Sequence, residues 1–354
     1  MLIPSSRCSA LCSPCSTISR SCIRPHILKQ SRSSYATLAH VPPHSSQPIS
    51  SIHHHPTAVN DPLTQYIYDN IATITRYSPL SSGSHRLSIS RTLPEILPYE
   101  PYPEANRRAD SSQSLNDRQG DGIVVVVHLV KSGPDNQVDF VISSGFVVQP
   151  DGPQEEHMVI TCSHTLDQIS NRYRKSPIYS FILSSVSTPA PVVLPITAYP
   201  SCSVADLLIC TIHPSNVLLR SLPVSPFPVY RGQEVLVHEF TSQKTSRGIP
   251  WIGGMMQREW RSAEMLGYRN YGWREVQPGT SSVLPYIIFS TRPINGSSGG
   301  PILDAASGAV VGIVSGSRTL SAVEGERGWG ASAENIFELF SLPGFIPASR
   351  KKRL

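Results

Sequence analysis

Short apolar runs alternate with turn signals along the chain from residue 123 onward. The runs are Ile123–Val130, Phe140–Val148, Met158–Thr161, Val192–Ile196, Leu207–Ile212, Glu234–His238, Tyr286–Ser290 and Val310–Ser315. Turn-forming residues separate the first of them, at Gly133–Asn136 and Pro150–Gly152. No helix-length periodic pattern lies between neighbouring runs. This rhythm predicts an all-β fold of antiparallel strands, arranged as a barrel or a sandwich.

Two further stretches have the spacing of amphipathic helices. Residues 60–62, Asn-Asp-Pro, form a helix-start signal, and apolar residues follow it at intervals of three or four. These residues are Leu63, Ile67, Ile71 and Ile74. We expect a helix over residues 61–77 that packs on the main domain or on a partner. Near the end of the chain, Ser332 is a candidate cap for a second helix with an apolar side formed by Ile336, Phe337, Leu339 and Phe340.

Composition narrows the class of protein. Of the 354 residues 39% are apolar, which is enough for a sizeable core, and the 32 prolines argue against a helical bundle. No apolar run reaches the roughly 18 residues of a membrane-spanning helix, so no membrane span is expected. The body of the chain holds only Cys162, Cys202 and Cys210, an odd number that favours a reducing or non-secretory compartment. The cysteines of the first 22 residues and the His53–His55 run lack clear ligand spacing, and we expect neither a metal nor a cofactor.

Positive charge is concentrated at the N-terminus. Residues 1–60 hold five Lys or Arg residues and no Asp or Glu, which leaves 25 basic and 25 acidic residues in the rest of the chain. A neutral body gives no reason to expect a nucleic-acid partner. The Arg- and Ser-rich, acid-free start predicts a mitochondrial targeting peptide over residues 1–35. The alternative is an N-terminal tail without a targeting signal, in a cytoplasmic or nuclear protein.

The rest of the chain divides where its composition changes. Residues 36–121 are expected to be a disordered or linker extension around the helix, with residues 79–120 as a linker or as a strap across the domain surface. Residues 122–345 form the expected folded domain, followed by the basic tail 346–354. Within the domain, the aromatic-rich stretch 239–285 is expected to be a lid over a cleft or a surface subdomain with its own core.

A serine between glycines is the strongest candidate for chemistry. Ser298 stands in Asn295–Pro301, a Gly/Ser-rich turn directly ahead of the apolar Ile302 and Leu303. Gly296 allows the backbone to turn its amides towards one point, so the N–H groups of Gly296 and Ser298 are candidates for an oxyanion hole. A plain Gly/Ser turn in a β-hairpin is the alternative.

A serine nucleophile needs a base and a third group that orients the base. His164 follows the apolar run Val159–Ser163, and Asp206 opens the apolar run that begins at Leu207, so both lie at strand ends as Ser298 does. The order His164, Asp206, Ser298 is that of chymotrypsin-type enzymes and differs from the orders of α/β-hydrolases and subtilisins.

Other histidines and acids fit these roles less well. His213 precedes Pro214 and belongs to a loop, and His238 ends a strand but leads into a polar loop. Asp167 lies only three residues after His164, too close along the chain to orient its ring.

Five motifs in this order resemble those of trypsin-like serine proteases, with spacing and strand sequence that favour the HtrA/DegP-like branch. They are Ser144–Val148, Val159–His164, Ala205–Ile209, Gly232–Val237 and Ile294–Pro301. The resemblance covers about residues 122–342. It implies a double antiparallel β-barrel of the chymotrypsin type, with the active site between the barrels, a C-terminal helix and an N-terminal extension. Only 56 residues follow Ser298, so the PDZ domain common in that branch is not expected.

The resemblance also implies roles for individual residues. His164 would be the general base, Asp206 its orienting partner and Ser298 the nucleophile, with Gly296 and Ser298 as the oxyanion hole. The implied substrate-binding residues are Arg292, Asn295, Ser315, Gly316 and Ser317, of which the last three offer backbone to an extended peptide.

The leading hypothesis is a serine endopeptidase that hydrolyses peptide bonds through an acyl-enzyme intermediate, in mitochondrial protein quality control or processing. Its partners are polypeptide substrates; the sequence indicates no oligomeric state and no P1 preference. A catalytically silent chaperone or scaffold with the same fold, which binds extended polypeptides, is the main alternative. A weaker one is an enzyme that uses the same triad on an ester.

Overall fold

Antiparallel strands make up most of the described chain, as the alternation of apolar runs predicts. The computed structural model describes residues 52–53, 62–76, 79, 92–100, 122–132, 137–151, 157–174, 176–184, 191–212, 219–241 and 248–342. The segments predicted as a targeting peptide and as a basic tail, 1–35 and 346–354, lie outside these residues.

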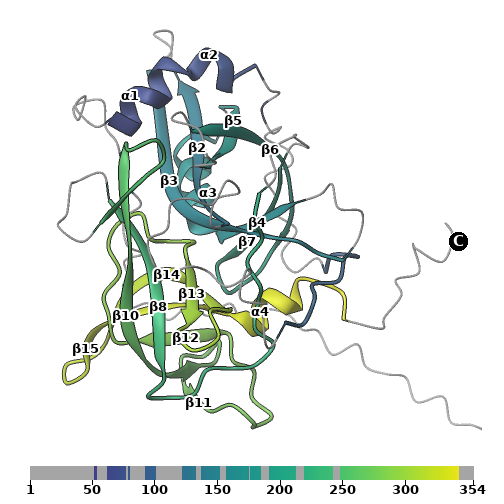
Figure 1. Ribbon diagram of the computed structural model, residues 1–354, viewed down its shortest axis with the longest axis vertical. Coiled ribbons are helices and arrows are strands. Elements are labelled where there is room, and N and C mark those ends of the chain that lie inside the picture. The colour runs from purple at the N-terminus through teal and green to yellow at the C-terminus, as the bar shows by residue number, and fades with distance from the viewer. Residues whose placement is uncertain are drawn as a thin grey trace, which may run out of the picture. The chain divides into compact units, whose positions relative to one another are not determined.

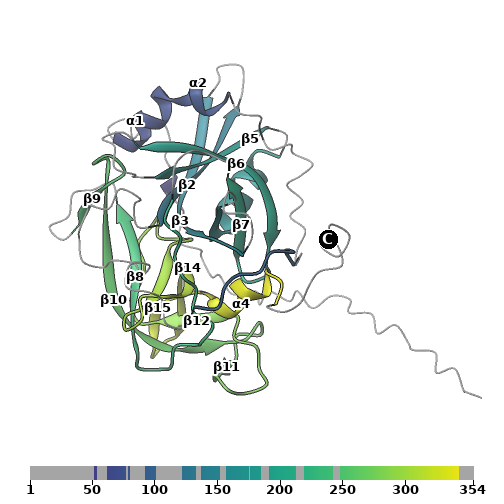
Figure 2. The ribbon, with the colours of Figure 1, turned by 45° about the vertical axis from the view of Figure 1, so that its right-hand side comes forward.

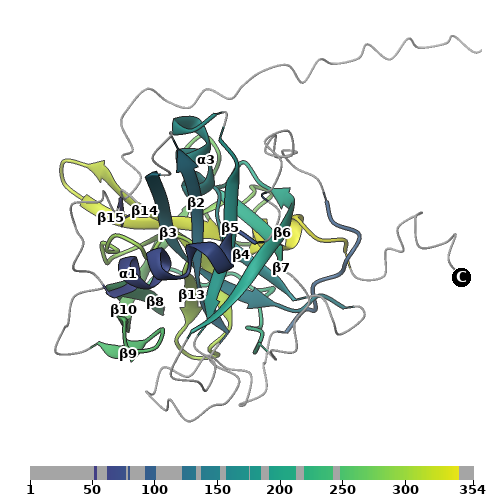
Figure 3. The ribbon, with the colours of Figure 1, turned by 90° about the horizontal axis from the view of Figure 1, so that it is seen from above.

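Six strands close into a first barrel, which Figure 3 shows from above. They are β2 (Ile123–Ser132), β3 (Gln137–Val148), β4 (Met158–Cys162), β5 (Ile178–Ser184), β6 (Val192–Cys202) and β7 (Leu207–Ile212). The order around the barrel is β3-β2-β5-β6-β7-β4, and the pairing of β3 with β4 closes it. The short strand β1 (Ile52–His53) pairs with β3 from outside this ring.

A second closed barrel of six strands follows in the chain and lies below the first in Figure 1. Its strands are β8 (Glu234–Thr241), β10 (Met256–Arg269), β12 (Tyr286–Phe289), β13 (Pro301–Asp304), β14 (Val310–Ser321) and β15 (Gly325–Ser332). They run in the order β10-β12-β15-β14-β13-β8, closed by the pairing of β10 with β8, while β9 (Ile249–Trp251) and β11 (Glu275–Val276) pair with β10. The predicted double antiparallel barrel is therefore confirmed.

Burial on both faces explains why the strands of the first barrel read as nearly continuous apolar runs. Along β2, Val125 and Val127 pack into one hydrophobic cluster, whereas the alternating Val124 and Val126 pack into another. Successive side chains of a strand point to opposite faces, so a strand covered on both sides has few positions for polar residues. The second cluster includes Leu166 of α3 (His164–Arg172), the helix that begins at the predicted base.

The amphipathic pattern near residue 62 forms two short helices on the first barrel, α1 (Pro62–Asp69) and α2 (Ile71–Ile74), visible at the top of Figures 1 and 2. Leu63 and Ile67 are buried in the same cluster as Val125 and Val127 of β2. The Tyr66 and Tyr68 hydroxyls donate to backbone oxygens of the barrel segments at 191 and 138, at 3.2 and 3.3 Å. The apolar side of this helical segment thus packs on the chain's own domain.

Residues 92–100 connect the first barrel to the C-terminal helix α4 (Ala333–Glu338). The Ile96 carbonyl accepts a hydrogen bond from Asp151 at 2.7 Å, and the Leu93 N–H donates to Leu339 at 2.8 Å. Leu93 and Leu97 are buried in the core. This part of the predicted linker is a strap that ties two regions far apart in sequence.

The stretch 239–285 is built into the second barrel, and the expectation of a separate lid or subdomain is wrong for its described residues. Its longest element, β10, pairs with β8 and β12 as a barrel wall. The expectation failed because half-exposed polar residues occur on both faces of β10, which hides the alternation of a strand.

Candidate active site

The first barrel brings His164 and Asp206 together through the pairing of two strands. The end of β4 pairs with the start of β7, with Cys162 opposite Leu207. His164 comes two residues after the end of β4, and Asp206 comes directly before β7. Antiparallel pairing therefore places the two side chains at the same end of the sheet, as the sequence argument requires.

Three hydrogen bonds hold the Asp206 carboxylate. His164 donates from Nδ1 at 2.8 Å and from its backbone N–H at 2.9 Å, and the Ser163 hydroxyl donates at 3.0 Å. Asp206 also has a φ of 70°, in the left-handed region that few residues other than glycine, asparagine and aspartate adopt. The carboxylate is thus fixed on the Nδ1 side of the imidazole, away from Nε2.

The contact between these groups changes the pKa of both. Burial by itself lowers the pKa of His164, but the charge and hydrogen bond of Asp206 act in the opposite direction, and the pKa lies well above 6.5. Burial raises the pKa of Asp206, whereas the charge and hydrogen bonds of His164 lower it below 3.8. The pair therefore favours an anionic carboxylate next to an imidazole that accepts a proton readily.

The turn that carries Ser298 is anchored to both barrels. The Ser144 N–H of β3 is shared between the carbonyls of Gly296, at 3.1 Å, and Ser298, at 2.8 Å. On the other side, the Gly299 N–H donates to Val314 of β14 at 2.7 Å. The turn of Ser298 consequently lies at the junction of the two barrels.

Gly299 cannot be replaced by a residue with a side chain without disturbing this junction. Its φ is 82°, and a Cβ would lie 2.2 Å from the Ser144 carbonyl oxygen and 2.3 Å from Thr161 Oγ1. These short distances show that the turn lies against Thr161 and Cys162, the last residues of β4, which precede His164. Gly299, the residue after Ser298, therefore lies against the end of β4, two residues ahead of His164.

The Ser298 hydroxyl does not bond to the imidazole in this structure. It donates to the Ser315 carbonyl oxygen at 3.4 Å, and Ser298 is 1% exposed. The contact of His164 Nε2 is instead the Cys162 thiol, at 3.8 Å. A rotation about χ1 of Ser298 changes the direction of its hydroxyl without moving the backbone, and catalytic hydrogen bonds are often long or misaligned before substrate binds.

The predicted oxyanion-hole amides have no protein acceptor among the described residues. Neither the Gly296 N–H nor the Ser298 N–H donates to a described group, whereas their neighbours Ser297 and Gly299 donate to Ile294 and Val314. Gly296 has a φ of 93°, which a side chain would make costly. Two unpaired amides beside a serine hydroxyl are suited to an oxyanion.

The predicted substrate-binding residues fall into two groups. Ser315, Gly316 and Ser317 lie on β14 beyond Ile313, its last residue paired with β13, so their side towards the nucleophile turn has no strand partner in the described part of the chain. Arg292 and Asn295 are exposed on the loop ahead of Ser298, and Arg292 forms an ion pair with Glu326 at 3.1 Å.

The alternative base His238 lies in a different environment. It is fully buried, its ring centroid lies 5.3 and 5.2 Å from those of Trp251 and Trp260, and burial lowers its pKa to about 3. No carboxylate contacts its ring in the described structure. His238 is therefore a neutral core residue, while His213 lies outside the described residues and stays untested.

Sequence reasoning missed two residues of the site, Ser163 and Cys162, and one contact of Ser315. Ser163 and Cys162, which contact Asp206 and His164, were treated only as part of the strand before the histidine. Ser315 was expected to bind substrate, and its carbonyl oxygen also accepts a hydrogen bond from the Ser298 hydroxyl. The position of Ser163 next to His164 was a signal for the first of these contacts.

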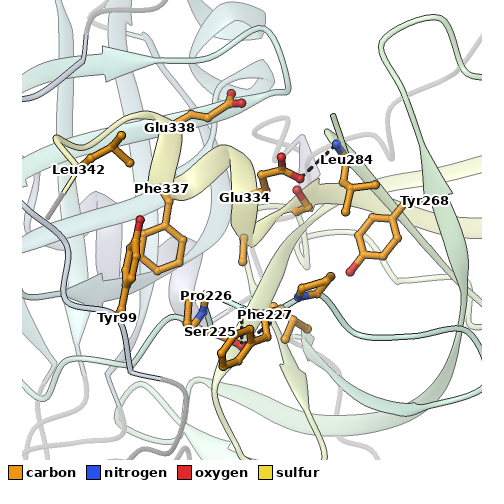
Figure 4. A pocket seen from close by; sticks show the side chains of 14 residues that line it. Tyr99, Ser225, Pro226, Phe227, Tyr268, Leu284, Glu334, Phe337, Glu338 and Leu342 are labelled. Carbon is orange, nitrogen blue, oxygen red and sulfur yellow. Dashed lines mark hydrogen bonds between the residues drawn. The ribbon is translucent and has the colours of Figure 1, made fainter. Parts of the chain in front are cut away.

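A cavity of about 370 Å³ lies in another part of the chain, between the strap, α4 and the connection that precedes β8 (Figure 4). Tyr99 and Phe337 pack edge to face on one side of it, at 4.8 Å, and Tyr268 lies on the other. Glu334 is at its edge, where it accepts from the Leu284 N–H at 3.2 Å. None of the predicted catalytic residues lines this cavity.

No helix in the described part of the chain is long and apolar enough to cross a membrane. Within the same residues, no three His, Cys, Asp or Glu side chains are grouped so as to hold a metal ion.

The two closed barrels, with a His–Asp pair and a glycine-flanked serine at their junction, have the architecture of a chymotrypsin-fold peptidase. Residues 143–313 match the family model described as "Trypsin-like peptidase domain". Residues 143–313 thus form a trypsin-like peptidase domain, the domain type of serine-type peptidases.

Searches of known proteins gave matches among solved structures. The active form of the Rv3671c protease from M. tuberculosis is 18% identical over 70% of this chain and 89% of that chain, with a TM-score of 0.39. The inactive form of the same protease is 21% identical over 58% and 83%, with a TM-score of 0.34. Deg5 is 16% identical over 56% and 80%, with a TM-score of 0.38. A search of curated proteins gave no match.

Proposed function

We propose that the protein is a serine endopeptidase in which Ser298 is the nucleophile, His164 the general base and Asp206 the residue that orients the base. The observation that carries this proposal is the His164–Asp206 pair, held at 2.8 Å, at the barrel junction where the Ser298 turn is anchored. Both strand ends and the turn are fixed by backbone pairing, which holds the groups that the reaction needs in defined positions.

The chemistry follows from these positions. The Ser298 hydroxyl turns from the Ser315 carbonyl to His164 Nε2, gives up its proton and attacks the peptide carbonyl carbon. The oxyanion accepts hydrogen bonds from the Gly296 and Ser298 amides. His164 then returns the proton to the leaving amine as the C–N bond breaks, and water hydrolyses the acyl-enzyme by the reverse sequence of proton transfers.

Substrate would bind as an extended strand along Ser315–Ser317, where β14 has an unpaired side next to the nucleophile. Such backbone pairing accepts many sequences, which suits an enzyme that degrades or processes unfolded chains. The motifs of the HtrA/DegP-like branch and the acid-free N-terminus favour a role in mitochondrial protein quality control or processing.

A fluorophosphonate probe tests the nucleophile directly. The folded full-length chain is expected to be labelled and to cleave an unfolded protein such as casein, and Ser298→Ala is expected to abolish both. Ser281→Ala is a matched control, because Ser281 is an exposed serine of the same domain. Labelling that persists in Ser298→Ala would refute the assignment of the nucleophile.

A non-cleaving polypeptide binder is the second candidate. The observation that favours it is the Ser298 hydroxyl, which bonds to Ser315 instead of His164. In that case the folded protein would bind unfolded casein without reacting with the probe. Reaction with the probe together with cleavage would exclude this candidate.

The cellular location has its own test. A fluorescent fusion of the full chain is expected in mitochondria, and the same fusion without residues 1–35 is expected in the cytosol. An unchanged mitochondrial signal after the deletion would refute the targeting role of this segment.

A further inference from the structure

A carboxylate with no exposed surface lies behind the nucleophile loop. Glu239 of β8 is 0% exposed and stands directly opposite Glu259 of β10 in the antiparallel register. Two like charges at opposed positions of paired strands repel each other. Arg261 offsets this repulsion, because its Nη2 atom lies 3.0 Å from Glu239 Oε2 and 3.2 Å from Glu259 Oε1.

Glu239 and Arg261 also reach the loop that carries the Gly296 and Ser298 amides. Arg261 donates from Nη1 to the Arg292 carbonyl at 3.4 Å, and the Ile294 N–H faces the Glu239 carboxyl and lowers its pKa. The Ile294 carbonyl in turn accepts from the Ser297 N–H at 3.2 Å, immediately ahead of the nucleophile. A chain of contacts therefore runs from the buried ion pair to the Gly296–Ser298 backbone.

The pairing of β8 with β13 explains why Glu239 lies so close to this loop. Ile302 pairs with Val237, and two residues earlier Gly300 is packed so tightly that a Cβ there would lie 3.3 Å from the His238 carbonyl oxygen. The next residue of β8 is Glu239. Barrel register thus brings the Glu239 side chain next to this loop.

Stability alone gives no reason for an acid at this position. Burial raises the pKa of Glu239 to about 7, against the attraction of Arg261. Neither carboxylate oxygen completes a hydrogen bond of regular geometry with a described residue. A buried ion pair with incomplete hydrogen bonding is commonly no more stable than a neutral pair of similar volume.

We infer that Glu239 and Arg261 form a clamp that holds the loop Arg292–Ser297 in the conformation that points the Gly296 and Ser298 amides at the reacting carbonyl. They contact neither substrate nor reacting atoms and are positioning residues for the peptidase reaction, so the inference rests on the proposed function. The titratable or charged groups that face Glu239 are Arg261 and Glu259 of β10. Its neighbour His238 is neutral.

Glu239→Gln tests the clamp, since glutamine keeps the shape of the side chain and removes its charge. We expect kcat on a peptide substrate to fall by about 100-fold, as for a displacement of about 1 Å in a catalytic group, with KM unchanged. Arg261→Met should cause a similar loss, and the double variant no further loss, because the two residues act as one unit. Glu264→Gln is the matched control, an exposed carboxylate on β10 whose side chain has no contact to the loop.

Hydrogen exchange of the peptide spanning residues 292–298 separates the clamp from the proposed catalysis. Faster exchange in Glu239→Gln, but not in Glu264→Gln, supports the clamp even if the wild-type protein fails to react with the fluorophosphonate probe. The protection of this peptide in the wild-type chain should also fall as pH is lowered through about 7, where Glu239 gains a proton, and should not fall in Glu239→Gln.

Unchanged exchange in both Glu239→Gln and Arg261→Met would overturn the clamp, whatever happens to activity. A loss of kcat that comes with a lower unfolding temperature and no local change in exchange would also overturn it, since that pattern indicates a purely structural role. If Glu239→Gln does not fold, hydrogen exchange of the same peptide in Arg261→Met tests the clamp through the other residue of the ion pair.

Discussion

Replacing Asp206 with asparagine should disable the proposed base without disturbing the fold around it. Asparagine tolerates the left-handed φ of 70° at this position, so the backbone has no reason to move. Its oxygen can still accept the bonds that Ser163 and the His164 backbone donate at 3.0 and 2.9 Å. The amide nitrogen then faces His164 Nδ1 and donates to it.

This reversal of a single hydrogen bond changes the tautomer of the imidazole. The proton moves to Nε2, the atom that has to receive the Ser298 proton, and the base is lost. A change of this kind costs about 10⁴-fold in kcat in enzymes with this triad, which corresponds to roughly 5 kcal/mol of transition-state stabilisation.

The pH dependence gives a second signature of the same pair. The wild-type pKa of His164 lies well above 6.5, so activity should appear only as the pH rises through that raised value. The pair contributes stability that is fully present below pH 6.5 and is lost as pH rises through the folded-state pKa. In Asp206→Asn both features should move towards the ordinary histidine value.

The rate of fluorophosphonate labelling, measured across pH and beside a thermal unfolding curve, is a suitable assay. Asp167→Asn is a matched control, because Asp167 is another acid near His164 that does not bond to its ring. A labelling rate for Asp206→Asn within about tenfold of wild type, in a folded protein, would refute the proposed role of Asp206.

Three further predictions concern the fold around the site. Gly299→Ala should lower the unfolding temperature and abolish labelling, whereas Gly254→Ala, with a similar φ of 80° but open space around it, should show only the cost of backbone strain, about 1 to 3 kcal/mol. Glu239→Gln should stabilise the protein at pH 8 by up to about 3 kcal/mol, because the folded-state pKa of Glu239, about 7, exceeds the ordinary value of 4.5. The wild-type protein loses stability as the pH rises between these two values. Denaturant unfolding at pH 5 and at pH 8 should therefore show the gain only at pH 8. Leu63→Ala should cost about 2 to 5 kcal/mol by denaturant unfolding and the exposed Gln65→Ala almost nothing; equal effects would contradict the packing of α1 on the barrel.

The strands of the fold were predictable where both faces of the sheet are apolar. The runs that became β2, β3, β4, β6 and β7 stand out because burial on two sides leaves little room for polar residues. β10 was missed because its partly exposed faces carry Arg, Glu and Gln among aromatic residues. A strand of that kind is defined by its partners in the barrel, which a single sequence does not reveal.

The candidate site was predictable as a set of residue types and less so as a geometry. His164, Asp206 and Ser298 could be chosen because each stands at the end of an apolar run. The pairing of Cys162 with Leu207, which brings the first two together, depends on a register that involves segments over 40 residues apart. The direction of the Ser298 hydroxyl and the burial of Glu239 depend on contacts with residues far away in the sequence, for which no local pattern exists.

The strap at residues 92–100 and the helices α1 and α2 determine which fragment of the chain can fold on its own. Leu93 and Leu97 are 4% and 3% exposed, and Leu63 of α1 is 1% exposed, so each of them shields apolar surface on the rest of the protein. A recombinant fragment that started at residue 122 would leave that surface facing water and should self-associate. Purification and crystallisation are therefore best attempted with a fragment that begins ahead of Pro62 and extends past Ser341.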